Sequence, residues 1–166
     1  MARNTRFNLF TLGTAAFVVA IAVAAGQARS QSLDVGLTGD LKRGDLGGTL
    51  ELHGLPVFTQ PSGISGGWGV AARAETDGDV WVGGGFVLDV PLSDAAFVEA
   101  SFMPGFYHPG DTELGGNLQF RSLVGVGWRV SPAGAVILSL DHMSNAGLED
   151  FNPGTETVAL RYRMEF

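Results

Sequence analysis

Residues 117–130 read NLQFRSLVGVGWRV, and the even positions of this stretch are apolar except for Ser122. Glutamine, arginine and glycine fill most of the odd positions, among them Arg121 and Arg129. Because successive side chains of a strand point to opposite faces, this alternation predicts a strand with one apolar and one polar face. In a bacterial membrane barrel the apolar face meets lipid and the other faces a polar lumen. Such a lumen best explains a row of arginines.

The same alternation recurs along the chain from residue 33 onward. Clear segments lie at 33–42, 67–75, 80–90, 117–130, 134–144 and 155–166, and weaker ones at 48–58 and 95–103. Together they make about eight strands of roughly ten residues, the length that a tilted strand needs to cross the bilayer. We predict an all-β fold, an eight-stranded antiparallel transmembrane β-barrel of the bacterial outer membrane. The alternative is a soluble secreted β-sandwich or lipocalin-like barrel, since alternation alone does not say which face is wet.

The connections between these segments alternate in length. The turn at 131–133 is tight, whereas 104–116 and 145–154 are long and rich in glycine, proline, asparagine and aspartate. Short periplasmic turns and long outer loops are typical of outer-membrane barrels. The chain ends in an alternating strand closed by Phe166, which resembles the C-terminal signal of such barrels. The weaker strands are interrupted by Gly54-Leu55-Pro56 and by Phe97, which falls on the polar face.

The N-terminal segment predicts a secretory signal peptide. Arg3 and Arg6 form a basic start, residues 9–25 are an uncharged, mostly apolar run, and small residues follow it. A run of about 17 residues could also just span a bilayer as an anchor helix, but its alanine and valine content favours a cleaved signal. We therefore predict a signal peptide at 1–28 and the barrel at 29–166.

Composition narrows the classes of function. The chain carries 10 basic and 17 acidic residues, and cleavage after residue 28 removes Arg3 and Arg6, so the formal charge goes from -7 to 8 - 17 = -9. A chain this acidic is a poor partner for nucleic acid. The sequence has no cysteine, which excludes disulfides and thiolate metal sites. Its mean hydropathy is +0.20 without a second long apolar stretch, as expected for membrane-crossing strands.

Polar residues stand at the ends of two apolar strand faces. The apolar face of 134–144 ends in His142 and Ser144, and the apolar face of the last strand begins with Glu156. If the two strands form a hairpin whose paired numbers sum to about 298, His142 lies opposite Glu156 at the distance of a cross-strand pair. All three polar groups would then meet on the lipid-facing surface of the barrel.

An imidazole between a hydroxyl and a carboxylate is what nucleophilic acyl transfer needs. His142 would accept the proton of Ser144, and Glu156 would orient the ring and stabilise the imidazolium. A site on the outer wall can reach an ester whose acyl chains stay in the bilayer. The three residues therefore predict an esterase acting on a membrane lipid.

The loop that follows Ser144 offers donors for an oxyanion hole, which a tetrahedral intermediate requires. The candidates are backbone N–H groups from Asn145 to Gly147 and the side chains of Asn145 or Asn152. The sequence leaves the choice among them open.

Three short motifs carry a resemblance to a known family. The chain reads His-Met-Ser-Asn-Ala-Gly at 142–147 and Asn-Pro-Gly at 152–154, followed by Glu156. Over its C-terminal part it resembles the PagL-type outer-membrane lipid A 3-O-deacylases. The resemblance implies a Ser-His-Glu triad and an upstream aromatic. In this sequence the implied positions are Ser144, His142, Glu156 and Phe120.

The implied activity is removal of the 3-O-linked 3-hydroxyacyl chain of lipid A in the outer membrane. Lipid A or lipopolysaccharide would be the substrate, and neither a cofactor nor a metal is implied. Pairing of two barrels as a homodimer stays open. The alternative is a non-enzymatic small outer-membrane barrel with a structural or ligand-binding role, in which 142–156 only anchors a loop.

Other ionisable residues are better explained by structure than by catalysis. Asp141 adjoins His142, but alternation turns it into the lumen, where we expect it to pair with an arginine. Its available partners are Arg121, Arg129 and Arg161. Neither of the other two histidines has a His, Asp or Glu neighbour at the spacing of a metal site.

Overall fold

The computed structural model describes residues 30–166, and the predicted signal peptide lies outside the described residues. Within 30–166, no helix is long and apolar enough to cross a membrane. The strands are β1 (Ser30–Asp40), β2 (Leu46–Thr59), β3 (Ser65–Glu75), β4 (Val80–Pro91), β5 (Ala96–His108), β6 (Leu118–Ser131), β7 (Gly134–Ser144) and β8 (Thr155–Glu165).

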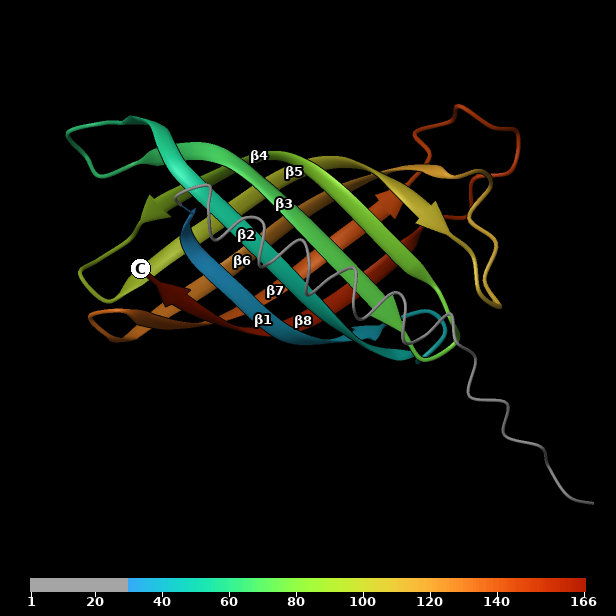
Figure 1. Cartoon of the computed structure of the whole chain (residues 1–166), viewed down its shortest axis with the longest axis horizontal. Coiled ribbons are helices and arrows are strands. Elements are labelled where there is room, and N and C mark those ends of the chain that lie inside the picture. Colours follow the sequence, from blue (N-terminus) through green and yellow to red (C-terminus); the bar gives the residue numbers. More distant parts are fainter. Residues whose placement is uncertain (1–29) are drawn as a thin grey trace, which may run out of the picture.

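The strands follow one another in sequence order around a closed antiparallel barrel (Figure 1). Closure is made by β1 and β8, in which Val35 is paired with Tyr162. A closed barrel has no free sheet edge, so every strand satisfies its backbone groups against two neighbours. The predicted eight-stranded antiparallel barrel is confirmed. Loops 41–45, 76–79, 109–117 and 145–154 lie at the end opposite the C-terminus (Figure 1).

The last hairpin has the boundaries that the sequence predicted. β7 ends at Ser144 and β8 begins at Thr155, so the connection is 145–154. By contrast, β2 passes straight through Gly54-Leu55-Pro56, with shifts in its register against β3 on both sides of Pro56. A bulge accommodates both an extra residue and a proline, which has no N–H to donate. The predicted interruption is therefore a bulge inside a longer strand.

β5 is longer than the sequence indicated. The alternation predicted a loop from Pro104 onward, but β5 extends to His108, so this boundary was wrong. Pro104 is paired with Phe120 of β6, whereas the register between β4 and β5 skips this position. A proline is tolerated in a strand where the ladder does not need its N–H. The loop proper is 109–117.

The two faces of the strands differ as the alternation predicted. On the outer face Val126 and Leu138 are 56% and 59% exposed, whereas Ile137, one residue away from Leu138, is fully buried. Exposed apolar side chains continue around the wall. A band of this kind is expected of a surface that faces lipid rather than water.

Charged residues fill much of the lumen. Arg161 of β8 contacts Glu99 of β5 at 2.6 Å and Asp34 of β1 at 2.9 Å. Arg121 of β6 contacts Glu51 of β2 at 2.6 Å, so this pair joins opposite walls of the barrel. Leaving one of these charges buried without its partner would cost about 3–5 kcal/mol. The lumen is therefore held by mutually paired charges.

Asp141 belongs to this network, as predicted. Its carboxylate contacts Arg121 at 3.2 Å and also Arg73 at 3.0 Å. Of the two other predicted partners, Arg161 is engaged elsewhere, and Arg129 lies over the ring of Phe97 at 4.9 Å. The lumen face, rather than the outer site, is where Asp141 acts.

Candidate active site

The register of the last hairpin brings His142 and Glu156 together on the outer wall. They are paired across β7 and β8, which confirms the predicted alignment. His142 Nδ1 lies 2.9 Å from Glu156 Oε1, and the two side chains are 51% and 34% exposed. A carboxylate at one ring nitrogen fixes the orientation of the ring and turns the other nitrogen, Nε2, toward the surroundings. For a hydrogen bond to the carboxylate, Nδ1 must carry a proton and act as the donor.

Ser144 is the last residue of β7 and stands two residues beyond His142, so both side chains point to the same face. Its side chain is half-buried, and its neighbour across the ladder is Phe120 of β6. Across residues 30–166, no protein group hydrogen-bonds to the Ser144 hydroxyl or to His142 Nε2. The structure therefore joins His142 to Glu156 directly and leaves Ser144 beside them on the same face without a hydrogen bond to the ring.

A lysine that sequence reasoning missed holds the second oxygen of Glu156. Lys42, in loop 41–45, places its Nζ 2.9 Å from Glu156 Oε2. The same ammonium donates to the carbonyl of Pro153 at 3.2 Å. The contact depends on the pairing of β1 with β8, where Asp40 aligns with Thr157. The local pattern around Lys42 carries no sign of it; only an assumed closure register could have found it.

Gly154 makes room for the imidazole. Its backbone adopts a positive φ of 59° just before β8 begins. A Cβ at this position would lie 2.9 Å from His142 Cε1, closer than side chains normally approach. Glycine is the residue that tolerates both the backbone conformation and the close approach. The Asn-Pro-Gly motif thus shapes the wall against which the His142 ring lies.

Asn145 ties two loops together and is fully buried. Its Nδ2 donates to the carbonyls of Gly115 at 2.6 Å and Phe151 at 2.8 Å. Its Oδ1 accepts the N–H of Gly147 at 2.9 Å, and its own N–H donates to Asn152 Oδ1 at 3.1 Å. The donors predicted at Asn145 and Gly147 are therefore engaged in holding the loop.

Two of the candidate donors are not engaged in hydrogen bonds within the described residues. Neither the Asn152 amide nitrogen nor the Ala146 N–H has a hydrogen-bond partner among the described residues. Ala146 has a positive φ of 57°, which is unusual for a residue with a side chain. Such strain turns a backbone N–H in a direction that a regular strand would not give it.

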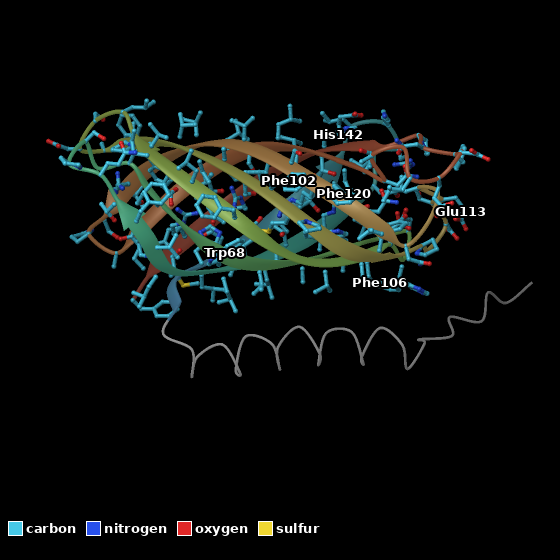
Figure 2. The ribbon with its side chains drawn as sticks, turned by 90° about the horizontal axis from the view of Figure 1, so that it is seen from above. Trp68, Phe102, Phe106, Glu113, Phe120 and His142 are labelled. Carbon is cyan, nitrogen blue, oxygen red and sulfur yellow. The ribbon has the colours of Figure 1, made fainter. Side chains whose placement is uncertain are left out.

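An aromatic surface flanks Ser144. Phe120 stacks on Phe102 with ring centroids 6.0 Å apart and an angle of 13° between the rings. Phe106 and Leu118 lie beside them toward the loop end and are exposed. In Figure 2 Phe120 and His142 lie in the half of the barrel that carries Glu113, whereas Trp68 lies toward the other end. The Ser144 hydroxyl thus lies next to an exposed apolar surface.

One cluster of residues with metal-binding chemistry lies in the lumen, away from this site. Asp34, His53 and Glu99 cluster inside the lumen. The guanidinium of Arg163 already joins them, with contacts of 2.7 Å to Asp34 and 3.1 Å to His53 and a third contact to Glu99. A cation in their midst makes this cluster an ion-pair network rather than a metal centre.

The sequence matches the lipid A 3-O-deacylase (PagL) family over residues 54–165. The chain belongs to this family. The match includes β3 to β8 and with them the His142, Ser144 and Glu156 positions, but Lys42 lies before it. The family assignment therefore agrees with the resemblance carried by the motifs at 142–156.

Similar proteins agree with the assignment to the PagL family. The lipid A deacylase PagL of Bordetella bronchiseptica is 30% identical over 86 residues, which are 52% of this chain and 44% of that protein. The chain thus matches less than half the length of this relative. The crystal structure of the outer-membrane enzyme PagL superposes with a TM-score of 0.65 at 24% identity, covering 82% of this chain and 99% of that one. A designed transmembrane β-barrel gives a TM-score of 0.58 at 9% identity, covering 83% and 97%. These two likenesses concern the fold alone.

Proposed function

We propose that this PagL family member is an esterase that removes the 3-O-linked 3-hydroxyacyl chain of lipid A in the outer membrane. The observation that carries the proposal is the His142–Glu156 contact on the outer wall, with Ser144 on the same face. The family match names the reaction class, and the printed activity of the Bordetella relative is lipid A deacylation. No cofactor enters the proposed reaction.

In the proposed mechanism Ser144 is the nucleophile. Its Oγ attacks the ester carbonyl while His142 Nε2 takes its proton, and Glu156 stabilises the imidazolium through Nδ1. The tetrahedral intermediate collapses, the sugar oxygen leaves with the proton from His142, and the acyl group stays on Ser144. Water then attacks the acyl-enzyme while His142 accepts its proton. The bond to Ser144 Oγ breaks, Oγ takes the proton back from His142, and a 3-hydroxy fatty acid is released.

The oxyanion is assigned to the donors that the loop leaves unused. The Asn152 amide nitrogen and the Ala146 N–H both belong to loop 145–154, which directly follows Ser144. Donors held in place before the reaction stabilise developing charge most, because they need no rearrangement. Asn145 contributes indirectly, since its buried hydrogen bonds fix the loop that carries the other two.

The position of the site on the outside of the barrel supports a membrane lipid as substrate. An ester near the glycolipid headgroup can approach Ser144 sideways while its acyl chains remain in the bilayer. The exposed surface of Phe102, Phe106 and Phe120 offers an apolar path beside the nucleophile. In this account the chain is exported with residues 1–28 as a cleaved signal and inserts as a multi-pass barrel, as a monomer or a homodimer.

Mass spectrometry of lipid A from cells producing the protein tests the proposal. Wild type should remove one hydroxyacyl group, and Ser144→Ala should leave lipid A intact while reaching the membrane in equal amount. Ser122→Ala is a matched control. Ser122 of β6 also faces outward and is paired with His142, on the side of β7 that is away from Glu156. Unchanged lipid A in cells with correctly folded wild type would favour the non-enzymatic alternative and contradict the proposal.

A further inference from the structure

Loop 41–45 is built around Asp40, the last residue of β1. One oxygen of Asp40 accepts the N–H groups of Lys42 and Arg43, each at 2.7 Å. The other accepts from the Arg43 guanidinium at 2.9 Å and from the hydroxyl of Thr155. The N–H of Gly44 closes the turn on the carbonyl of Asp40 at 2.9 Å. Five donors on one residue, four to its carboxylate and one to its carbonyl, give this turn a defined shape.

The turn is fastened to the start of β8 on two sides. Arg43 Nη1 donates to Thr155 Oγ1 at 3.0 Å, and the N–H of Leu41 donates to the carbonyl of Glu156 at 2.9 Å. Lys42 stands between these two attachments. The backbone on both sides of Lys42 is therefore held in place, and this positions its ammonium next to Glu156.

We infer that Lys42 is a positioning residue for the Glu156 carboxylate, and this inference rests on the proposed esterase function. Lys42 Nζ occupies Oε2 at 2.9 Å, while Oε1 faces His142 at the same distance. With one oxygen held by the ammonium, the carboxylate cannot rotate away from the imidazole. The Lys42 side chain thus extends the proposed triad to a fourth residue that does not touch the reacting ester.

The charge of Lys42 matters as much as its position. Glu156 stands on a wall where lipid replaces water, and an isolated carboxylate is unfavourable there. The charged or titratable groups that face Glu156 are Lys42 from loop 41–45 and His142 from β7. Arg43 of the same loop is turned to Asp40. Lys42 is therefore the cation that balances Glu156 while His142 is neutral.

Removing this cation has a consequence that simple loosening of the loop does not have. Without Lys42, Glu156 gains a proton more readily, because the positive charge that favours its ionised form is gone. A protonated Glu156 no longer supports His142 as a base, so activity at low pH is lost. The acid side of the rate profile should therefore move to higher pH.

Release of 3-hydroxy fatty acid from purified lipid A in detergent micelles, measured against pH, tests the inference. Lys42→Met should lower kcat about fivefold to tenfold with little change in KM, and should shift the acid limb upward. Lys42→Arg should restore both, because it keeps a cation of similar reach. Arg129→Met is the matched control, since it removes one cation at the opposite mouth of the barrel.

Each outcome of this experiment decides the role of Lys42. If Lys42→Met keeps the wild-type rate and pH profile, Lys42 does not position Glu156. A lower kcat with an unmoved acid limb would also overturn the inference, because Lys42 would then only anchor the loop through the carbonyl of Pro153. A folded wild type that releases no fatty acid would instead refute the proposed esterase function.

Discussion

The lumen and the outer wall of this barrel both carry ionisable side chains, but they differ in how completely those side chains are paired. In the lumen Arg161 and Glu99 are fully buried and contact each other at 2.6 Å. On the wall His142 and Glu156 are partly exposed, and His142 Nε2 and the Ser144 hydroxyl have no partner within the described barrel. In the lumen each of these charges faces an opposite charge, so removing one of them would leave its partner buried and unpaired. A polar group that keeps bonding capacity on a lipid-facing surface is available for chemistry.

The largest expected effect on the wall is a loss of activity without a loss of stability. His142→Ala removes the proposed base, so kcat should fall about 10⁴-fold or more. Because the ring is half-exposed, the thermal unfolding temperature should stay within a few degrees of wild type. Fatty acid release and a thermal melt of the same purified sample check both statements. A melt that drops as far as that of a lumen variant would erase the contrast between the two regions.

The lumen should show the opposite result. Arg161→Met leaves Asp34 and Glu99 with one guanidinium fewer, which should lower the free energy of unfolding by about 3–5 kcal/mol. Urea unfolding in detergent or lipid measures this change. The folded fraction should keep the wild-type kcat, because the ion pairs of Arg161 are with lumen carboxylates and not with His142, Ser144 or Glu156. If stability is unchanged and kcat falls, the lumen network serves the site rather than the fold.

A smaller effect should separate the two kinds of asparagine in loop 145–154. Asn152→Asp keeps the oxygen that accepts the Asn145 N–H but removes the amide donor assigned to the oxyanion. It should lower kcat about 10²-fold, with KM little changed. Hydrogen exchange of the loop should match wild type, because the Asn145 hydrogen bonds are kept. Faster exchange throughout the loop would mean that Asn152 acts by holding the loop.

Much of the fold was predictable because each strand faces lipid on one side and the polar lumen on the other, which imposes a period of two on its sequence. The alternation placed Val126 outside and Arg121 inside, and the structure agrees. The errors fall where backbone irregularity replaces simple pairing. Pro56 lies in a bulge, and Pro104 stands where one ladder skips a residue. A proline is normally a signal to end a strand, and only the neighbouring strands decide whether it does.

The candidate site also contains contacts that the sequence predicted and contacts that it did not. The contact of His142 with Glu156 follows from parity and one short hairpin, so local sequence sufficed to predict it. Lys42 was missed because its contact joins the first and last strands, whose register is set by closure of the whole barrel. Asn145 was one of the candidate oxyanion donors; its side-chain amide donates to carbonyls of loops 109–117 and 145–154, which no local pattern reveals. Contacts between side chains that are far apart in the sequence therefore could not be predicted from the sequence alone.

The charges in the lumen also bear on what the barrel lets through. Arg121 meets Glu51 from the opposite wall, and Arg161 of β8 meets Glu99 of β5, three strands away around the ring. Side chains that join opposite walls leave no wide column of water along the barrel. With its axis filled in this way, the proposed catalyst would add no wide pore to the outer membrane, and the barrier to small solutes would be kept. The proposed reaction thus takes place on the outer surface of a barrel whose lumen is crossed by paired charges.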